Sequence, residues 1–395
     1  MGHAKSETRK RSDEMGDNQL LRKFRELKSL SGTHSPSIDV LIKELDIRIK
    51  VDACFLSNPY ATDLFLEHFY EDFVSKTTFR DLLEHYPPQN KDISKRLSQY
   101  LKVSPENIFI GNGAIEIIQA ILHNFVKGRI SIPLPTFSSY YEFVRKDTTE
   151  VFHFQLREED DFRLNAHEYL RFVRDNRINN VVLINPNNPD GSYVSQSDLV
   201  YLLTELKDID NFILDESFIH FAFEDDEYNF IDLSELIYSF PNLTIIKSMS
   251  KDFGIAGIRS GYALTRPEYV SSLLDNGYLW NVNGFSSYFF KLYVQEGFQK
   301  RYEQCRKEYI RHTQKFYSDL SRIQGLRVYP SKANFFLMKT PEGYDSTEYM
   351  LTLLDRYGLY VRDCSDKLGL GGNYIRVASR REEENTYMIE CFAGL

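Results

Sequence analysis

Short apolar segments alternate with segments of helical spacing between residues 107 and 264, and this alternation limits the fold more than any other feature. Val181-Val182-Leu183-Ile184 is apolar without a break, as expected for a strand buried on both faces. Other short segments read as strands are Asn107–Ile110, Ile130–Pro133, Phe212–Leu214 and Leu243–Ile246, and Val151–Leu156 alternates as a strand does. The chain is therefore expected to have an α/β fold, with a mostly parallel sheet and with ligand-binding loops at the ends of its strands.

Three parts are expected along the chain of 395 residues. Residues 1–50 are expected to form an N-terminal arm that is partly disordered, because residues 1 to about 20 are polar and charged. Residues 51–295 are expected to form a large ligand-binding domain, and residues 296–395 a small α+β domain. The pattern from Ser286 to Phe316 predicts a long helical stretch that leads from the large domain into the small one.

Composition and charge exclude several classes of protein. The net charge of −9 argues against a nucleic-acid-binding surface, which needs a basic face. The chain has no apolar stretch of about 18 residues, so we expect no membrane span, and its N-terminus lacks the apolar core of a secretory signal. The four cysteines lack the spacing of a metal site and fit a reducing compartment. We therefore expect a cytoplasmic protein without a metal site.

A polar loop punctuated by glycines follows the segment Leu243–Ile246. It carries hydroxyls, one lysine, one arginine and three glycines: Ser248, Ser250, Lys251, Gly254, Gly257, Arg259 and Gly261. Hydroxyls and backbone N–H groups can surround a phosphate, and an arginine can clamp it with two hydrogen bonds. A lysine held among other cations loses its proton more easily and can attack a carbonyl. The loop predicts a phosphate site beside an amine nucleophile, although a solvated lysine in a surface turn is an equal alternative for the loop alone.

Other residues able to do chemistry stand where predicted strands end. Gly111-Asn112-Gly113-Ala114 joins a strand to a helix, an arrangement that can hold a phosphate on free N–H groups. Glu116 stands where the third glycine of a dinucleotide fingerprint belongs, which disfavours a nicotinamide-dependent oxidoreductase. Phe137, Asn188 and Asp215 follow later strands. Taken singly, these positions have ordinary alternatives: a steric glycine, a core aromatic ring and a helix-capping aspartate.

One ligand would use all of these loops at once. Its phosphate would meet the glycine turn, the two serines and Arg259, and its flat ring would stack on Phe137. A ring hydroxyl would meet Asn188, and a ring nitrogen would stay protonated beside Asp215. Its aldehyde would join Lys251. These properties together describe pyridoxal phosphate.

Three segments resemble the signature of fold-type I pyridoxal-phosphate enzymes, the class I and II aminotransferase group: NPNNPDG, ILDESF and SMSKDFGIAGIRSGY. The resemblance extends over roughly residues 50 to 395 and points to histidinol-phosphate aminotransferases and threonine-phosphate decarboxylases. It implies a seven-stranded-type sheet with helices on both faces, and it implies Lys251, in a Schiff base with the cofactor, and Asp215 as catalytic residues. The other cofactor contacts that it implies are Gly113, Ala114, Phe137, Asn188, Ser248, Ser250 and Arg259.

The resemblance also implies substrate contacts and a shared active site. Tyr60 resembles a tyrosine that reaches the cofactor phosphate of the neighbouring subunit, which implies a homodimer. Arg376 matches the arginine that takes the substrate carboxylate, and Arg362 matches a position that contacts the distal phosphate of phosphorylated substrates. Asn334 falls where the family places substrate contacts. His34, in a break between two helical patterns, is either a surface residue or a substrate contact.

Two positions depart from the family pattern. Phe218 stands three residues after Asp215, where many members have a tyrosine that donates to the ring oxygen. Losing that donor should raise the pKa of the Schiff base nitrogen. Phe137 stands where tyrosine is frequent, and stacking survives because the ring face is kept.

The reaction expected from the resemblance is amino-group transfer to or from a small phosphorylated amino acid or amine. If Arg376 holds the carboxylate in the plane of the ring, the Cα hydrogen leaves and transamination follows. If the carboxylate stands out of that plane, it is lost instead, so a decarboxylase of an O-phospho amino acid is the alternative. A DNA-binding regulator built on this fold is disfavoured, because the first 50 residues are too few and unlike a helix-turn-helix unit.

Overall fold

The computed structural model describes residues 19–32, 34–74, 76 and 79–395. These residues form two compact units. The larger unit is Leu56–Gln314 with Pro330–Asn334. The smaller unit combines the described part of Met1–Phe55 with Lys315–Tyr329 and Phe335–Leu395.

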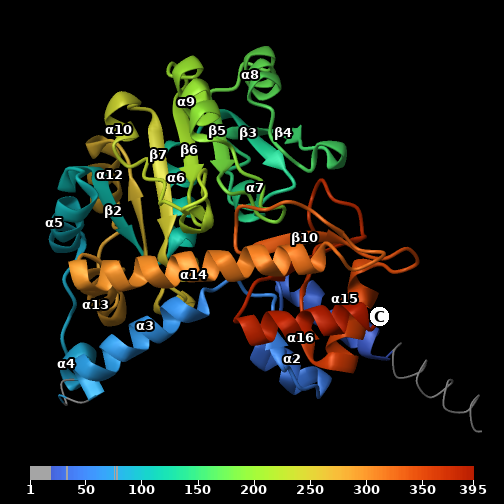
Figure 1. Ribbon diagram of the computed structural model, residues 1–395. Coiled ribbons are helices and arrows are strands. Elements are labelled where there is room, and N and C mark those ends of the chain that lie inside the picture. Colours follow the sequence, from blue (N-terminus) through green and yellow to red (C-terminus); the bar gives the residue numbers. More distant parts are fainter. Residues whose placement is uncertain (1–18, 33, 75, 77–78) are drawn as a thin grey trace, which may run out of the picture. The chain divides into compact units, whose positions relative to one another are not determined.

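A seven-stranded sheet forms the centre of the larger unit, with the order β2-β8-β7-β6-β5-β3-β4 (Figure 1). Its strands are β2 (Ile108–Gly111), β3 (Gly128–Leu134), β4 (Thr149–Gln155), β5 (Asn180–Ile184), β6 (Asn211–Asp215), β7 (Leu243–Ser248) and β8 (Gly261–Leu264). Strand β8 runs antiparallel to both of its neighbours, and the other neighbouring pairs are parallel. The predicted α/β fold with a mostly parallel sheet is confirmed.

The two faces of this sheet are buried under different helices. Successive residues of a strand point to opposite faces. Val181 and Leu183 belong to one apolar cluster and Val182 to another. The first cluster includes residues of α5 (Asn90–Leu101), α8 (Ala166–Asp175), α9 (Gln196–Glu205) and α13 (Gly284–Tyr293). The second includes residues of α6 (Ala114–Phe125) and α12 (Pro267–Asp275). Burial on both faces is why these strands are apolar without alternation.

The remaining helices of the larger unit are shorter or lie at its borders. They are α3 (Pro59–Phe69), α4 (Phe79–Glu84), α7 (Ser139–Glu142), α10 (Leu236–Ser239) and α11 (Met249–Asp252). The helical stretch expected from Ser286 to Phe316 consists of two helices, because α13 ends at Tyr293 and α14 spans Glu296–Leu320. The side chain of Gln299 donates to the carbonyl of Tyr293. It thereby satisfies one of the carbonyls that a helix end leaves open.

The smaller unit is α+β. A four-stranded antiparallel sheet has the order β12-β13-β10-β9, and a parallel pair joins β1 to β11. These strands are β1 (Val51–Asp52), β9 (Arg327–Val328), β10 (Phe335–Lys339), β11 (Leu359–Tyr360), β12 (Arg362–Asp363) and β13 (Tyr374–Ala378). The helices are α2 (Ile38–Leu45), α15 (Ser346–Tyr357), α16 (Glu382–Ala393) and the last part of α14.

The described part of the predicted N-terminal arm contributes to the core of the smaller unit. Residues 19–31 are helical. Phe24 is 2% exposed and belongs to one apolar cluster with Leu41 and Met350. The expected disorder of residues 1 to about 20 falls almost wholly outside the described residues. Packing changes unit inside α14, at Gln314, whereas the predicted domain boundary lies at residue 295.

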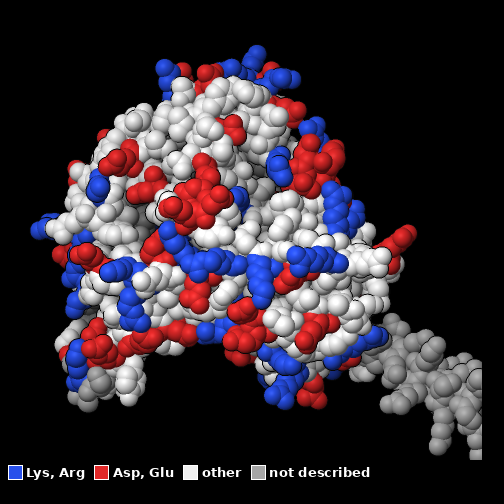
Figure 2. Space-filling view, viewed as in Figure 1, with Lys and Arg blue, Asp and Glu red and all other residues white. Residues whose placement is uncertain are grey.

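Acidic and basic side chains are interspersed on the visible face of the protein (Figure 2). Helix α14 carries both kinds, and Lys307 lies 3.7 Å from Glu303 on it. Within the described residues, no helix is both long and apolar enough to span a membrane. The same part of the chain holds no group of three or more His, Cys, Asp or Glu residues that could bind a metal ion.

Candidate active site

Three neighbouring strands bring three of the predicted residues to one edge of the large sheet. Strands β5, β6 and β7 are parallel neighbours, and Asp215 pairs in register with Ile184 and Ile246. Their carboxyl ends therefore lie side by side. Asn185 N–H donates to the carbonyl of Asp215 at 2.8 Å, which fixes the loop after β5 against the end of β6. The loops that carry Asn188, Asp215 and Lys251 thus start from the same sheet edge.

The carboxylate of Asp215 is buried at the end of β6, with 3% of the residue exposed. Tyr140 Oη donates to its Oδ2 at 2.8 Å, and Ser217 N–H donates to its Oδ1 at 2.8 Å. Burial raises the pKa of Asp215, while the hydrogen bonds from Ser217 and Tyr140 lower it. A cation facing this carboxylate would favour its charged form. Tyr140 was missed by sequence reasoning, because nothing in the chain marks it among 26 tyrosines.

Lys251 lies half-buried on α11, directly after β7. Ser248 caps this helix by accepting from Ser250 N–H at 3.3 Å. Asn58 N–H donates to the carbonyl of Lys251 at 3.0 Å, which ties the start of α3 to the lysine turn. The other lysine nearby, Lys247, is buried and forms an ion pair with Glu216. This pairing leaves Lys251 as the amine suited to attack a carbonyl.

The glycine turn and the arginine of the lysine loop are in direct contact. Gly113 has a φ of +81°, and a Cβ at this position would lie 2.5 Å from Arg259 Nη2. A Cβ on Gly261 would lie 3.0 Å from Ala114 N. Gly111 pairs with Gly261 in the sheet, so β2 and β8 place the two segments together. The guanidinium therefore lies against the N-terminal turn of α6, where free N–H groups favour an anion.

The loop after β5 is fixed by hydrogen bonds on both sides of Asn188. Asn185 Oδ1 accepts from Val194 N–H at 2.8 Å. Asn187 Nδ2 donates to the carbonyl of Pro135 at 2.8 Å, and Thr136 Oγ1 donates to Asn187 Oδ1 at 2.9 Å. Asn188 itself is 8% exposed. Since Phe137 directly follows Thr136, the two predicted ring contacts belong to loops that are bonded to each other.

Two predicted residues of the larger unit meet side chains of α14. Tyr60 Oη lies 2.7 Å from His312 Nδ1, and its ring lies 5.9 Å from the ring of Tyr309. Asn334 Nδ2 donates to Tyr309 Oη at 3.2 Å. Asn334 is fully buried, and among the described residues its Oδ1 has no hydrogen-bond partner. His312 and Tyr309 could not be predicted as site residues, because no local pattern marks them in a stretch expected to connect the two domains.

The predicted substrate residues of the smaller unit lie on neighbouring strands. Arg362 and Arg376 are cross-strand partners on β12 and β13, and both are buried. Arg376 Nη2 donates to the carbonyl of Cys54 at 2.8 Å, and burial lowers the pKa of Arg376. Arg362 Nη2 donates to both carboxylate oxygens of Asp366, at 2.9 and 2.8 Å. His34 is exposed, and its carbonyl accepts from Lys28 Nζ at 2.9 Å.

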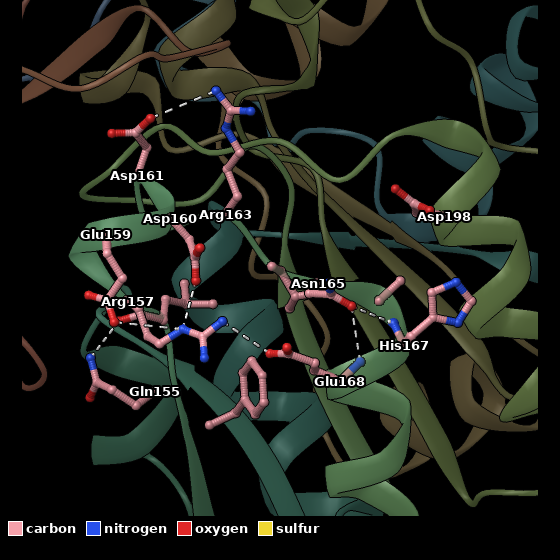
Figure 3. Close-up of a pocket in the computed structure, with 14 residues that line it drawn as sticks. Gln155, Arg157, Glu159, Asp160, Asp161, Arg163, Asn165, His167, Glu168 and Asp198 are labelled. Carbon is pink, nitrogen blue, oxygen red and sulfur yellow. Dashed lines mark hydrogen bonds and ion pairs between the residues drawn. The ribbon is translucent and has the colours of Figure 1, made fainter.

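A pocket of about 500 Å³ on the larger unit contains none of the predicted residues (Figure 3). Its charged side chains pair with one another: Arg157 lies 2.6 Å from Asp160 and 3.3 Å from Glu168. Asn165 Oδ1 accepts from the N–H groups of His167 and Glu168 at 3.1 Å, so it caps α8. These side chains already bond to one another, at the end of β4 and the start of α8.

Residues 62–392 match the family model described as aminotransferase class I and II. The chain belongs to the class I and II aminotransferase family. The family predicted from the three motifs is thus confirmed.

Relatives in this family include decarboxylases and aminotransferases. L-serine phosphate decarboxylase of Campylobacter jejuni is 49% identical over 380 residues, which are 96% of this chain and 97% of that protein. A solved decarboxylase from Sulfurospirillum multivorans has 43% identity and a TM-score of 0.92, covering 97% of this chain and 98% of the other. The histidinol-phosphate aminotransferase structure from Clostridium acetobutylicum has 25% identity and a TM-score of 0.74, covering 87% and 98%.

The cofactor of the class I and II aminotransferase family is pyridoxal phosphate, and the residues of this chain fit it. The turn at Gly113 packs directly against Arg259, and a Cβ at this position would clash with the guanidinium. Because glycine has no Cβ, the turn can present its backbone N–H groups to a ligand. Ser250 Oγ is buried and has no hydrogen-bond partner among the described residues, so a phosphate oxygen could accept from it. The buried Asp215 suits a protonated ring nitrogen, and Lys251 suits the aldehyde.

Proposed function

We propose that this protein is a pyridoxal-phosphate-dependent decarboxylase of an O-phospho amino acid, with O-phospho-L-serine as its substrate. The observation that carries the proposal is the near end-to-end similarity to an L-serine phosphate decarboxylase. The solved decarboxylase with the same fold supports it. Transamination, the reaction first expected from the family, is less well supported than decarboxylation, because the aminotransferase relatives are more distant.

The proposed cofactor contacts are the strand-end residues of the larger unit. Gly113, Ala114, Ser248, Ser250 and Arg259 would hold the phosphate, because they offer N–H groups, hydroxyls and a guanidinium. The contacts proposed for the ring and the aldehyde are Phe137, Asn188, Asp215 and Lys251. When bound, pyridoxal phosphate supplies an electron sink for the bond that breaks at Cα of the substrate.

In decarboxylation, the bond between Cα and the carboxylate carbon breaks and CO₂ leaves. The electron pair stays at Cα, which must then receive one proton to give the amine product. We assign this proton to Lys251 Nζ, the amine at the end of β7. With the cofactor bound, the ionised carboxylate of Asp215 would favour a protonated ring nitrogen.

Arg376 and Arg362 are the proposed anion-binding residues of the substrate site. O-phospho-L-serine has two anionic groups, a carboxylate and a phosphate, and the two arginines are buried cross-strand partners. Arg376 would bind the carboxylate and Arg362 the phosphate. Asn334, with its buried Oδ1, would accept a hydrogen bond from the substrate. His34 remains a proposed substrate contact. Its side chain is exposed, so the contact would come from the loop that contains it.

We also propose that the protein is a homodimer in which Tyr60 contributes to the active site of the neighbouring subunit. In one chain, the hydroxyl of Tyr60 bonds to His312 on α14, so this histidine orients the tyrosine ring. Most oligomers of this kind have twofold symmetry, in which each chain gives the same residue to the other.

The proposed compartment is the cytoplasm. All four cysteines, Cys54, Cys305, Cys364 and Cys391, are free thiols. Free thiols are typical of reducing compartments. Fractionation of the source cells should recover the protein with cytoplasmic markers, and recovery from the cell exterior would contradict this assignment.

The proposed reaction can be tested with the purified holoenzyme and O-phospho-L-serine as the only organic substrate. We expect CO₂ and phosphoethanolamine in equal amounts, without an added keto acid. Formation of a phosphorylated keto acid that depends on an added amino acceptor would instead support transamination.

A further inference from the structure

Four charged side chains form a buried cluster in the smaller unit, and we call it the Asp366 cluster: Lys28, Arg362, Asp366 and Lys367. Lys28 Nζ donates to Asp366 Oδ2 at 2.7 Å, and Arg362 Nη2 donates to both oxygens of the same carboxylate. The side chains of Lys28 and Asp366 are 14% and 16% exposed. Lys367 is 6% exposed and stands directly after Asp366, and its N–H donates to the carbonyl of Cys364 at 3.0 Å. Two cations, Lys28 and Arg362, therefore bind one carboxylate, and a third buried cation is its neighbour in the chain.

The nearby Asp363 adds a second carboxylate to this region, and it acts on Lys28 as well. Its carboxylate accepts from Ser346 Oγ at 2.6 Å and from Thr347 Oγ1 at 2.8 Å, at the start of α15. It also accepts from Ser365 N–H at 2.9 Å. Hydroxyls and N–H groups thus take up its lone pairs, and Asp366 is the carboxylate that faces Arg362 and Lys28.

Arg376 adds a further positive charge beside the cluster. It stands directly opposite Arg362 on the neighbouring strand. Like charges at such positions destabilise a sheet. With both lysines protonated, Lys28, Arg362, Lys367 and Arg376 carry four positive charges against the two negative charges of Asp363 and Asp366, an excess of two. A phosphate monoester dianion has the charge that would balance this excess.

The pKa values of the two lysines agree with an excess of positive charge in the cluster. Burial, and then the charge of Arg362, lowers the pKa of Lys28. The same two causes, in the same order, lower the pKa of Lys367 to about 8. The groups that face Lys367 are Arg362, Asp366, Cys364 and Arg376, so cations outnumber the one carboxylate. A bound anion would raise both pKa values.

We propose that Lys28 and Lys367 determine specificity for a phosphorylated substrate by binding its phosphate together with Arg362. Asp366 is a positioning residue that holds Arg362 and Lys28 in place for this contact. The inference rests on the proposed function and deepens it, because it assigns the phosphate to residues beyond Arg362. It also gives the segment before α2, which contains Lys28, a role in substrate recognition.

The proposal has a pH dependence with a defined sign. Lys367 must be protonated to bind the phosphate, so kcat/KM for the phosphorylated substrate should fall as the pH rises above about 8. On the acid side, the phosphate loses its second charge below a pKa of about 6. Binding should therefore be strongest between these two values.

The test uses the holoenzyme and the variants Lys28→Met and Lys367→Met, which keep the length of the side chain but remove its charge. Each should raise KM for O-phospho-L-serine by about 10- to 100-fold, the usual effect of losing one charge-assisted hydrogen bond. The change in kcat should be much smaller, and Lys28→Arg should restore most of the affinity. Lys43→Met is the matched control, because Lys43 is exposed on α2 of the same unit.

Calorimetry with inorganic phosphate gives a readout that does not depend on the reaction. The cofactor fills its own phosphate site in the holoenzyme, so the measured binding reports the Asp366 cluster. Weaker phosphate binding in both variants supports the proposal even if O-phospho-L-serine proves not to be the substrate. Unchanged KM and unchanged phosphate binding in correctly folded variants would overturn it, as would equal losses on O-phospho-L-serine and on unphosphorylated L-serine.

Discussion

At the scale of single residues, the bond from Tyr140 to Asp215 links two side chains that are far apart in sequence. Burial raises the pKa of Asp215, and the hydroxyl of Tyr140 is one of the groups that lower it. In Tyr140→Phe the pKa of Asp215 should therefore rise further, and activity that needs the carboxylate anion should be lost at a higher pH. We expect the acid limb of the kcat profile to move to higher pH, with a loss of up to about 10-fold on that limb.

A matched control for this change is Tyr201→Phe. It removes a hydroxyl that lies 3.0 Å from Nδ1 of His167, one of the residues that line the pocket in Figure 3. Its pH profile should equal that of the unmodified enzyme. A Tyr140→Phe profile that also stays in place would show that the hydroxyl has no influence on the charge of Asp215.

The covalent attachment of the cofactor is a second test at the residue scale. Lys251→Ala should lose the visible absorbance of the bound cofactor and reduce activity by at least about 10²- to 10⁴-fold, because the amine also moves a proton. Lys95→Ala, on an exposed face of α5, serves as the control. An unchanged spectrum in Lys251→Ala would place the cofactor on another amine.

At this scale the sequence could place a residue in the fold where that residue directly follows a strand. Lys251 and Asp215 stand directly after predicted strands, so their place at the sheet edge follows from the strands alone. Tyr140, Tyr309 and His312 could not be found in this way, because their hydrogen-bond partners lie 75, 25 and 252 residues away. Long-range partners of this kind depend on packing that no local pattern records.

At the scale of structural elements, the turn before α6 and the loop before β8 form one unit around Arg259. Gly113→Ala would require a left-handed backbone and would displace the guanidinium, since its Cβ would lie 2.5 Å from Nη2. We expect the affinity of the cofactor-free enzyme for pyridoxal phosphate to fall by about 10-fold or more, the loss of roughly one charge-assisted contact. Fluorescence titration with the cofactor measures this affinity.

Gly257→Ala is the matched control for this loop. Its Cβ would meet no atom within 4 Å. Its affinity for the cofactor should match that of the unmodified enzyme. Equal affinities in the Gly113 and Gly257 variants would show that the glycine turn does not contribute to phosphate binding.

The elements of the sheet could be predicted because β5, β6 and β7 are buried on both faces and read as unbroken apolar runs. The antiparallel direction of β8 could not be predicted, since a short apolar strand has no mark of its orientation. The burial of Phe24 in the core also could not be predicted from the sequence. Its helical spacing shows that one face is apolar, but it does not show which element covers that face.

At the scale of the whole molecule, the proposed homodimer predicts that two inactive variants can complement each other. Lys251→Ala and Tyr60→Phe each damage a different residue, and a hybrid dimer would keep one intact site if Tyr60 acts across the interface. Random pairing of equal amounts makes half of the dimers hybrids, so about one quarter of the normal sites should be intact. Activity of the mixture no higher than the mean of the two separate variants would contradict the shared site.

The substrate residues could be named from the sequence only through the resemblance, because Arg362, Arg376 and Asn334 have no local pattern that marks them. Their partners explain why. Arg362 bonds to Asp366, Arg376 bonds to a carbonyl at residue 54, and both contacts depend on how the smaller unit packs. The charge balance around Asp366 could not be predicted either, because Lys28 lies 338 residues away from it in the sequence.

The central claim is that the holoenzyme breaks the Cα–carboxylate bond of a phosphorylated amino acid. The most direct measurement is nuclear magnetic resonance of the products from O-phospho-L-serine, labelled with ¹³C in its carboxylate, in deuterated water. The account predicts labelled CO₂ and an equal amount of phosphoethanolamine with a single deuterium at the former Cα. Label that stays in a phosphorylated keto acid, with no labelled CO₂, would contradict it.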